Sequence, residues 1–235
     1  MKRLTSRKEF LQLQREVVAC RRCPRLVKWR EQVAREKVKR FAGEDYWGKP
    51  IPSLGDPSAR LLIVGLAPAA HGANRTGRMF TGDRSGEWLF RALHKAGFAN
   101  QATAEHRRDG LRLTDCLIAA SCRCAPPQNK PTRQEMLNCR PFLLREVALL
   151  RNLRVVVALG KIAFDTTLAT FGEVYNRRYT PKPRFTHGAE SSLTDRIALI
   201  ASFHPSQQNT FTGRLTEQML DAIFRRTNRL LAKSR

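Results

Sequence analysis

Four cysteines in this 235-residue chain have the spacing of metal ligands. Cys20 and Cys23 form a Cys-x-x-Cys pair, and Cys124 and Cys139 form a second, more widely spaced pair. Two thiolates separated by two residues can bind one metal centre from a single turn, and a distant second pair can complete the site. Spacing alone supports tetrahedral Zn²⁺ and a [4Fe–4S] cluster equally.

Two further cysteines bear on that site. Cys122 offers an alternative ligand to Cys124, while Cys116 falls in an apolar run and is expected to be a small buried residue. Six cysteines without a secretion signal indicate thiols that stay reduced, which favours metal binding over disulfides.

A glycine-rich segment from Gly65 to Gly86 follows an apolar run. It matches neither a dinucleotide-binding fingerprint nor a P-loop. Its small residues would let backbone N–H groups approach a ligand closely. It also carries one aromatic ring, Phe80, and one carboxylate, Asp83. Taken singly, Phe80 could be a core residue and Asp83 the cap of the following helix.

A second polar segment runs from His204 to Arg214 and also follows an apolar run. In parallel α/β sheets, ligands bind beyond the carboxyl ends of the strands. The two segments are therefore expected to line one crevice.

The elements that position these residues alternate between strand and helix patterns. Strands are predicted over 60–65, 113–120, 155–159 and 196–202, and helices over 85–96 and 161–171. A capping box at Thr132 opens another helix that Pro141 should break or restart, and residues 29–56 look irregular. This order predicts an α/β fold: a single domain over 1–235, with a central, mostly parallel four-stranded sheet flanked by helices on both faces, an α/β/α sandwich.

Two terminal helices complete the prediction. A capping box at Ser6 opens a helix, and we assign residues 6–23 to a helix that delivers the first cysteine pair. A basic amphipathic helix is predicted over 216–232.

The charge balance points to a polyanionic partner. Forty-three Lys and Arg against 20 Asp and Glu give a formal charge of +23, and neutralising phosphates releases counterions. No apolar stretch approaches the roughly 20 residues of a membrane span. We expect a cytoplasmic, nucleoid-associated protein.

Taken together, three motifs resemble the uracil-DNA glycosylase superfamily, and within it the iron–sulfur-containing family 5. The resemblance covers about Cys20 to Arg214. Its motifs are Gly65-Leu-Ala-Pro-Ala with Gly77-Arg-Met-Phe-Thr-Gly-Asp83, His204-Pro-Ser-Gln-Gln-Asn-Thr, and Arg123-Cys-Ala-Pro-Pro-Gln-Asn-Lys-Pro131. It implies a monofunctional DNA glycosylase of base excision repair that holds a [4Fe–4S] cluster on Cys20, Cys23, Cys124 and Cys139, with Cys122 as an extra.

The resemblance also implies roles for the two polar segments. Phe80 would stack on a flipped base, with the backbone at Gly65 and Ala67 beside it. His204 would donate a hydrogen bond to the departing uracil, and Asp83 would position or activate water. DNA contacts are expected from Ser206, Gln207, Asn209 and Arg214. His71 and Asp115 are weaker rivals for the role of Asp83.

Two departures from the related families affect specificity. Leu66 and Ala69 are apolar or small where sister families carry a polar residue, so water activation is assigned to Asp83. Ala120 stands where related enzymes carry an asparagine that reads the uracil edge. Without that amide we expect looser discrimination, with hypoxanthine and substituted uracils as further substrates of a monomeric enzyme.

Two other functions remain open from the residues alone. The first is a non-catalytic nucleic-acid-binding protein with a structural zinc site. The second is a phosphoesterase or nuclease that uses Asp83, Asp115 and His204 with a divalent metal.

Overall fold

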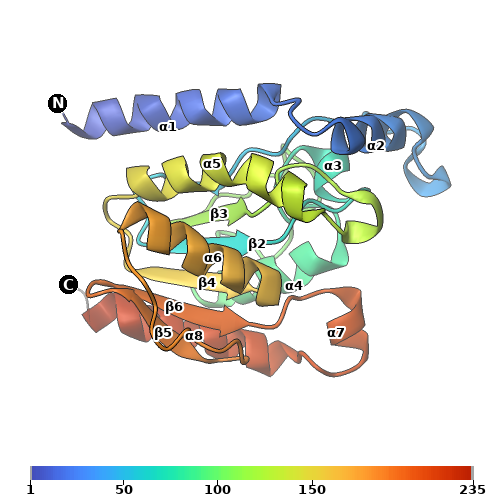
Figure 1. Ribbon diagram of the computed structural model, residues 1–235. Coiled ribbons are helices and arrows are strands. Elements are labelled where there is room, and N and C mark those ends of the chain that lie inside the picture. Colours follow the sequence, from blue (N-terminus) through green and yellow to red (C-terminus); the bar gives the residue numbers. More distant parts are fainter. Residues whose placement is uncertain (1, 234–235) are drawn as a thin grey trace.

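The computed structural model describes residues 2–233, with side chains from residue 7 onward. Its centre is a sheet with strand order β1-β3-β2-β4-β6-β5 (Figure 1). The four central strands run parallel, as expected for continuous apolar runs that are buried on both faces. They are the four strands predicted from the sequence: β2 (Leu61–Gly65), β3 (Cys116–Ala120), β4 (Val155–Leu159) and β6 (Ile197–Ser202).

The prediction of four strands is wrong at both edges of the sheet. β1 (Leu54–Gly55) pairs antiparallel with β3, and β5 (Glu190–Thr194) pairs antiparallel with β6. β1 has only two residues, and β5 reads Glu-Ser-Ser-Leu-Thr with a largely exposed surface. Edge strands of this kind need no apolar run, so hydrophobicity alone does not reveal them.

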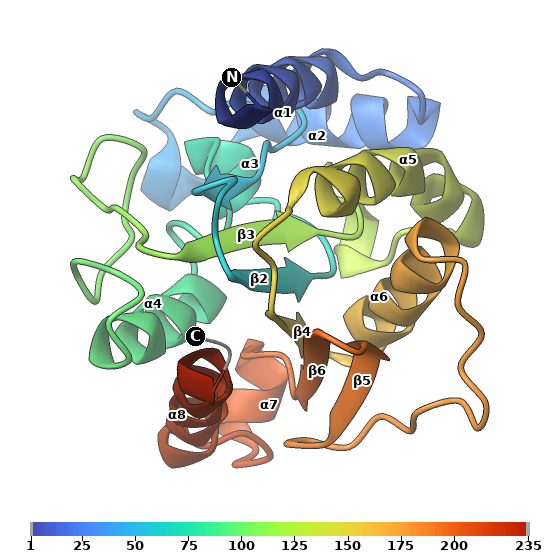
Figure 2. The same ribbon diagram turned by 90° about the vertical axis from the view of Figure 1, so that its left-hand side faces the viewer.

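Helices cover both faces of the sheet, which confirms the α/β/α arrangement (Figure 2). Leu61 and Ile63 point toward one layer, and Leu62 and Val64 toward the other, as alternation along a strand requires. The first layer contains α4 (Arg84–Lys95) and α8 (Glu217–Lys233). The second contains α5 (Arg133–Leu149) and α6 (Lys161–Val174), with α1 (Lys2–Ala19) packed outside α5.

The interval 29–56, predicted to be irregular, begins inside a helix, α2 (Pro24–Glu36). Pro24 suits a first helical turn because its missing N–H needs no partner there. The buried side of α2 carries Leu26, Val27 and Val33, and also Arg30, whose charge obscures the apolar period in the sequence. The remaining short helices are η1 (Lys39–Phe41), α3 (Ala73–Thr76), η2 (Pro127–Asn129) and α7 (Gln207–Phe211).

Two helix boundaries differ from prediction. α1 begins earlier than Ser6, at Lys2, and ends at Ala19, so Cys20 and Cys23 lie in the connection to α2; the predicted Ser6 cap involves a side chain outside the described residues. The Thr132 capping box is confirmed.

The expected break at Pro141 is wrong, because α5 runs through it. A proline inside a helix costs about 3 kcal/mol. Burial of the neighbouring side chains Phe142 and Leu143, at about 1.5–3 kcal/mol each, offsets that cost.

Candidate active site

A cavity of about 680 Å³ lies at the carboxyl ends of the central strands. Gly65 at the end of β2, Ala120 at the end of β3 and His204 just after β6 all line it. The glycine-rich segment and the His204 segment thus line one cavity, as the alternation of strands and helices predicted. Its lining comprises residues 65–73, 83–85 and 206–208 together with Arg40, Met79, Phe80, Ala120, Gln128, Asn129 and His204.

Phe80 forms one wall of this cavity and is held there by its backbone. Its φ of +52° lies in the left-handed region, which is unusual for a bulky residue. A Cβ added at Gly65 would lie 2.9 Å from Cζ of the Phe80 ring, and one at Gly86 would overlap the Phe80 carbonyl. The two glycines that bound the segment are therefore required for the position of Phe80. The ring lies 6.0 Å from that of His204, with an angle of 30° between the planes.

Asp83 both caps a helix and lines the cavity. Its Oδ1 accepts a hydrogen bond of 2.9 Å from the backbone N–H of Gly86 and so caps α4. The other oxygen, Oδ2, lies against Gly72, where a Cβ would approach it to 2.1 Å. Burial raises the pKa of Asp83 above its usual value, although the bonds from Gly86 and Ser85 oppose the shift. A carboxylate with a raised pKa that faces a cavity can act as a base.

His204 provides the second chemical group. Burial lowers its pKa to about 4, so the ring is neutral at pH 7 and carries one N–H donor. Within the described residues no hydrogen-bond partner is found for its ring nitrogens. The Asn209 side chain donates to the His204 backbone carbonyl at 2.9 Å, which fixes the start of the segment. His204 is thus positioned to donate a hydrogen bond to a ligand in the cavity.

Of the two alternative candidates for the role of Asp83, the structure places His71 in the cavity and Asp115 outside it. His71 lines the same cavity, but its Nδ1 is 3.1 Å from the Tyr46 hydroxyl, and burial lowers its pKa. Asp115 precedes β3 and therefore lies at the opposite, amino end of the sheet, where it pairs with Arg60 at 2.5 Å. That position removes Asp115 as a candidate for the site.

The four residues predicted to contact DNA lie in three different surroundings. Ser206 and Gln207 line the cavity, and Ser206 also caps α7. Asn209 supports His204, as described above. Arg214 does not line the cavity; it is exposed and its guanidinium lies over the Phe203 ring at 4.7 Å.

Several side chains at the mouth of the cavity were not predicted. Gln128 and Asn129 reach it through two successive left-handed residues in η2, with φ values of +54° and +57°. Arg84 also lines the mouth, and its guanidinium lies 4.7 Å from the ring of Phe211, which is 68% exposed. The sequence signal for them was the motif from Arg123 to Pro131, which contains both residues, and asparagine is among the residues that tolerate a left-handed backbone.

The cysteines surround a separate, small cavity. The four predicted ligands line it together with Cys122. Three N–H donors reach their sulfurs: Arg30 Nη1 to Cys124 at 3.0 Å, the Arg123 backbone to Cys139 at 3.2 Å, and Asn138 to Cys23 at 3.5 Å. Cys116 is buried on β3, as predicted.

The pKa values of several of these thiols are shifted in different directions. Burial raises the pKa of Cys124 to about 12 and also raises that of Cys23. A hydrogen bond with Cys122 lowers the pKa of Cys139. Among the described side chains, no group of three or more His, Cys, Asp or Glu is arranged to hold a metal ion. The cysteines line one shared cavity.

No helix in the described part of the chain has the length and hydropathy that a bilayer crossing requires.

Comparisons with known proteins agree with this geometry. Residues 52–228 match the model of the uracil DNA glycosylase superfamily. A type-5 uracil-DNA glycosylase of Mycobacterium tuberculosis is 52% identical over 215 residues, which cover 91% of this chain and 79% of the relative. Type-5 enzymes of Mycobacterium leprae and Thermus thermophilus are 50% and 48% identical, each over 94% of the relative and over 93% and 91% of this chain. The chain therefore belongs to the uracil DNA glycosylase superfamily and groups with its type-5 members.

Proposed function

We propose that this protein is a monofunctional DNA glycosylase that hydrolyses the N-glycosidic bond of uracil in DNA, the first step of base excision repair. The observation that carries the proposal is the convergence of Phe80, Asp83 and His204 on one cavity. The names of the type-5 relatives and the net charge of +23 support DNA as the substrate. The fold and the cavity support an enzyme over a non-catalytic nucleic-acid-binding protein.

The target nucleotide must leave the base stack, at a cost of a few kcal/mol, before it can enter this cavity. The Phe80 ring offers a stacking platform for the extruded base. Because the backbone of Phe80 is fixed by Gly65 and Gly86, the platform is formed before the base arrives. Preorganisation of this kind lowers the entropic cost of binding.

Cleavage breaks the bond between C1′ of the sugar and N1 of uracil, and the bonding electrons leave with the base. Positive charge develops on the sugar and negative charge on the uracil oxygens. Neutral His204 would donate its N–H to the uracil oxygen, a hydrogen bond that strengthens as the charge grows. Asp83 would stabilise the sugar cation and accept a proton from the water whose oxygen bonds to C1′. The products are free uracil and an abasic site.

The direct test uses a labelled duplex with a single uracil, incubated with the protein in EDTA and then treated with alkali. We expect cleavage at the uracil position only after alkali. A metal-dependent nuclease or phosphoesterase would instead cut without alkali and would stop in EDTA. An intact strand after alkali would reject the glycosylase proposal.

We further propose that the base range extends beyond uracil. Ala120 lines the cavity and offers no amide, so no buried polar group is left unpaired when another base enters. The Gln128 and Asn129 amides are exposed at the mouth. An oligonucleotide panel with hypoxanthine and 5-substituted uracils tests this, and release of uracil alone would contradict it.

A [4Fe–4S] cluster held by Cys20, Cys23, Cys124 and Cys139 completes the proposal. The shared cavity and the three N–H donors to sulfur support a thiolate-bound centre at this position. The similarity to the iron–sulfur-containing family favours a [4Fe–4S] cluster over one Zn²⁺. When bound, the cluster would link the α1–α2 connection to Cys124 before α5 and to Cys139 within α5, and so stabilise the fold. Iron and sulfide analysis with visible absorption tests the proposal. A colourless protein containing zinc would contradict it.

We propose that the enzyme acts as a monomer on DNA. Its net charge of +23 opposes self-association at low ionic strength. Light scattering with and without DNA provides the measurement, and a stable dimer would contradict the proposal.

A further inference from the structure

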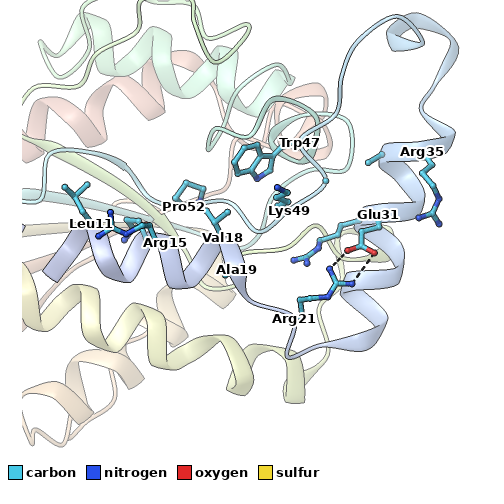
Figure 3. Close-up of a pocket in the computed structure, with 14 residues that line it drawn as sticks. Leu11, Arg15, Val18, Ala19, Arg21, Glu31, Arg35, Trp47, Lys49 and Pro52 are labelled. Carbon is cyan, nitrogen blue, oxygen red and sulfur yellow. Dashed lines mark hydrogen bonds and ion pairs between the residues drawn. The ribbon is translucent and has the colours of Figure 1, made fainter. Parts of the chain in front are cut away.

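A second large cavity lies away from the candidate active site and shares no lining residue with it. It has a volume of about 870 Å³ and lies between α1, α2 and residues 47–52 (Figure 3). We call it the α1–α2 groove. The mechanism proposed above uses none of its side chains.

Two different sides of α1 carry apolar residues, and one of these sides lines the groove. One side of the helix carries Phe10, Leu13 and Val17, which are buried. A second side carries Leu11, Val18 and Ala19, which line the groove, and Leu11 is 51% exposed. α1 thus has an apolar, solvent-facing strip that is separate from its buried side and opens into the groove.

The floor of the groove is apolar and its rim is basic. Ala34, Trp47 and Pro52 add to the apolar side chains of α1. The rim carries Arg15 on α1, Arg21 in the α1–α2 connection, Arg35 on α2 and Lys49 in the stretch 47–52 (Figure 3). Arg30 lies deeper, where it donates to the Cys124 sulfur.

The only acidic side chain of the lining is Glu31, which pairs with Arg21 at 2.6 Å. Arg15, Arg35 and Lys49 have no carboxylate partner among the described residues. The lining therefore carries excess positive charge beside an apolar floor.

We propose that the α1–α2 groove binds an acidic peptide segment of a partner protein, with apolar side chains on the floor and carboxylates against Arg15, Arg35 and Lys49. Between Leu11 and Ala19 the helix rises roughly 12 Å, the length of about four extended residues. A short segment is therefore sufficient to fill the groove.

Charge and shape favour this occupant over two others. A second copy of the chain would bring another +23 to a basic surface, so self-association is opposed electrostatically. A DNA strand would find cations at the rim, but the floor is mainly aliphatic, and Trp47 is its one aromatic residue. Strand binding without sequence preference relies on stacking of successive bases on aromatic rings.

The test is fluorescence polarisation with a short labelled peptide of alternating Asp and Leu. Peptides of Asp alone and of alternating Lys and Leu serve as comparisons. The variant R15E/K49E reverses two rim charges, and Leu11→Asp changes the exposed floor. The matched control R151E/R178E reverses two exposed charges outside the groove.

We expect the Asp–Leu peptide to bind at least about tenfold more tightly than either comparison peptide. R15E/K49E should weaken binding about tenfold, since each exposed ion pair contributes up to about 1 kcal/mol. Leu11→Asp should also weaken it, and the control variant should bind as the wild type does. Uracil excision, measured in parallel, should be unchanged in all of these variants, which separates a failure to fold from a loss of docking.

Two results would overturn the proposal. One is equal peptide affinity in the wild type and both groove variants. The other is displacement of the peptide by uracil-free single-stranded DNA whose own affinity falls about tenfold in R15E/K49E, because the groove would then be a DNA surface.

Discussion

Replacement of Asp83 by asparagine separates the chemical role of this residue from its structural role. Asparagine caps helices about as well as aspartate, so the bond from the Gly86 N–H is retained. What is lost is the negative charge that would stabilise the sugar cation and accept the proton of water. General-base groups contribute about 10²- to 10⁴-fold to rate, so the single-turnover rate of uracil excision should fall by that factor.

The thermal stability of D83N, unlike its excision rate, should not fall. Burial raises the pKa of Asp83 in the folded state, so above its unfolded pKa the folded protein binds more protons than the unfolded chain. Ionised Asp83 therefore destabilises the fold at pH 7, and D83N should melt no lower than the wild type. D83A, which loses the cap, should be about 1 kcal/mol less stable than D83N, or about 2–4 °C in Tm.

The assay is single-turnover excision from a uracil duplex, measured from acidic to neutral pH alongside melting curves. The wild-type rate should rise with pH as Asp83 ionises, and D83N should lose that rise. Asp115→Asn is the control, because Asp115 lies at the opposite end of the sheet. A wild-type excision rate in D83N would refute the assigned role and leave Asp83 as a helix cap only.

Three further predictions follow from the same geometry. His204→Ala should lower single-turnover excision by about 10²-fold or more. Because the pKa of His204 is about 4, its titration should not limit the rate between pH 6 and 8; a rate that follows a group of pKa near 6.5 and disappears in this variant would contradict that. Gly65→Ala should displace the Phe80 ring, since the added Cβ lies 2.9 Å from it, and weaken uracil-DNA affinity without unfolding the protein; unchanged affinity would show that the ring is not the platform. Glu146→Ala leaves the fully buried guanidinium of Arg123 without its carboxylate and should cost about 3–5 kcal/mol in denaturant unfolding, whereas a loss below about 1 kcal/mol would contradict the argument.

The sequence predicts the central sheet well because its four parallel strands are buried on both faces. β2 and β4 are continuous apolar runs, a pattern that only full burial requires. β5 escaped prediction because an edge strand with polar side chains has no such pattern. α2 was not expected because the buried position at Arg30 is polar, and its burial depends on bonds to the Cys124 sulfur and the Cys20 carbonyl.

The candidate site, like the fold, was predicted only in part. The two polar segments stood out because each directly follows a predicted strand, and the roles of Phe80, Asp83 and His204 came from the resemblance to the uracil-DNA glycosylase superfamily. The sequence could not exclude Asp115, since the choice depends on which end of β3 carries the residue. Gln128 and Asn129 were missed because their approach to the cavity depends on two left-handed residues, a tertiary feature that composition does not reveal.

The most direct test of the central claim is mass spectrometry of the intact products formed from a uracil-containing duplex in EDTA. If Phe80, Asp83 and His204 form a glycosylase site, free uracil will appear, and the strand will lose the mass of uracil less one water with its backbone unbroken. D83N should yield these products far more slowly. A strand of unchanged mass, or one cut at the phosphate with the base still attached, would contradict the account.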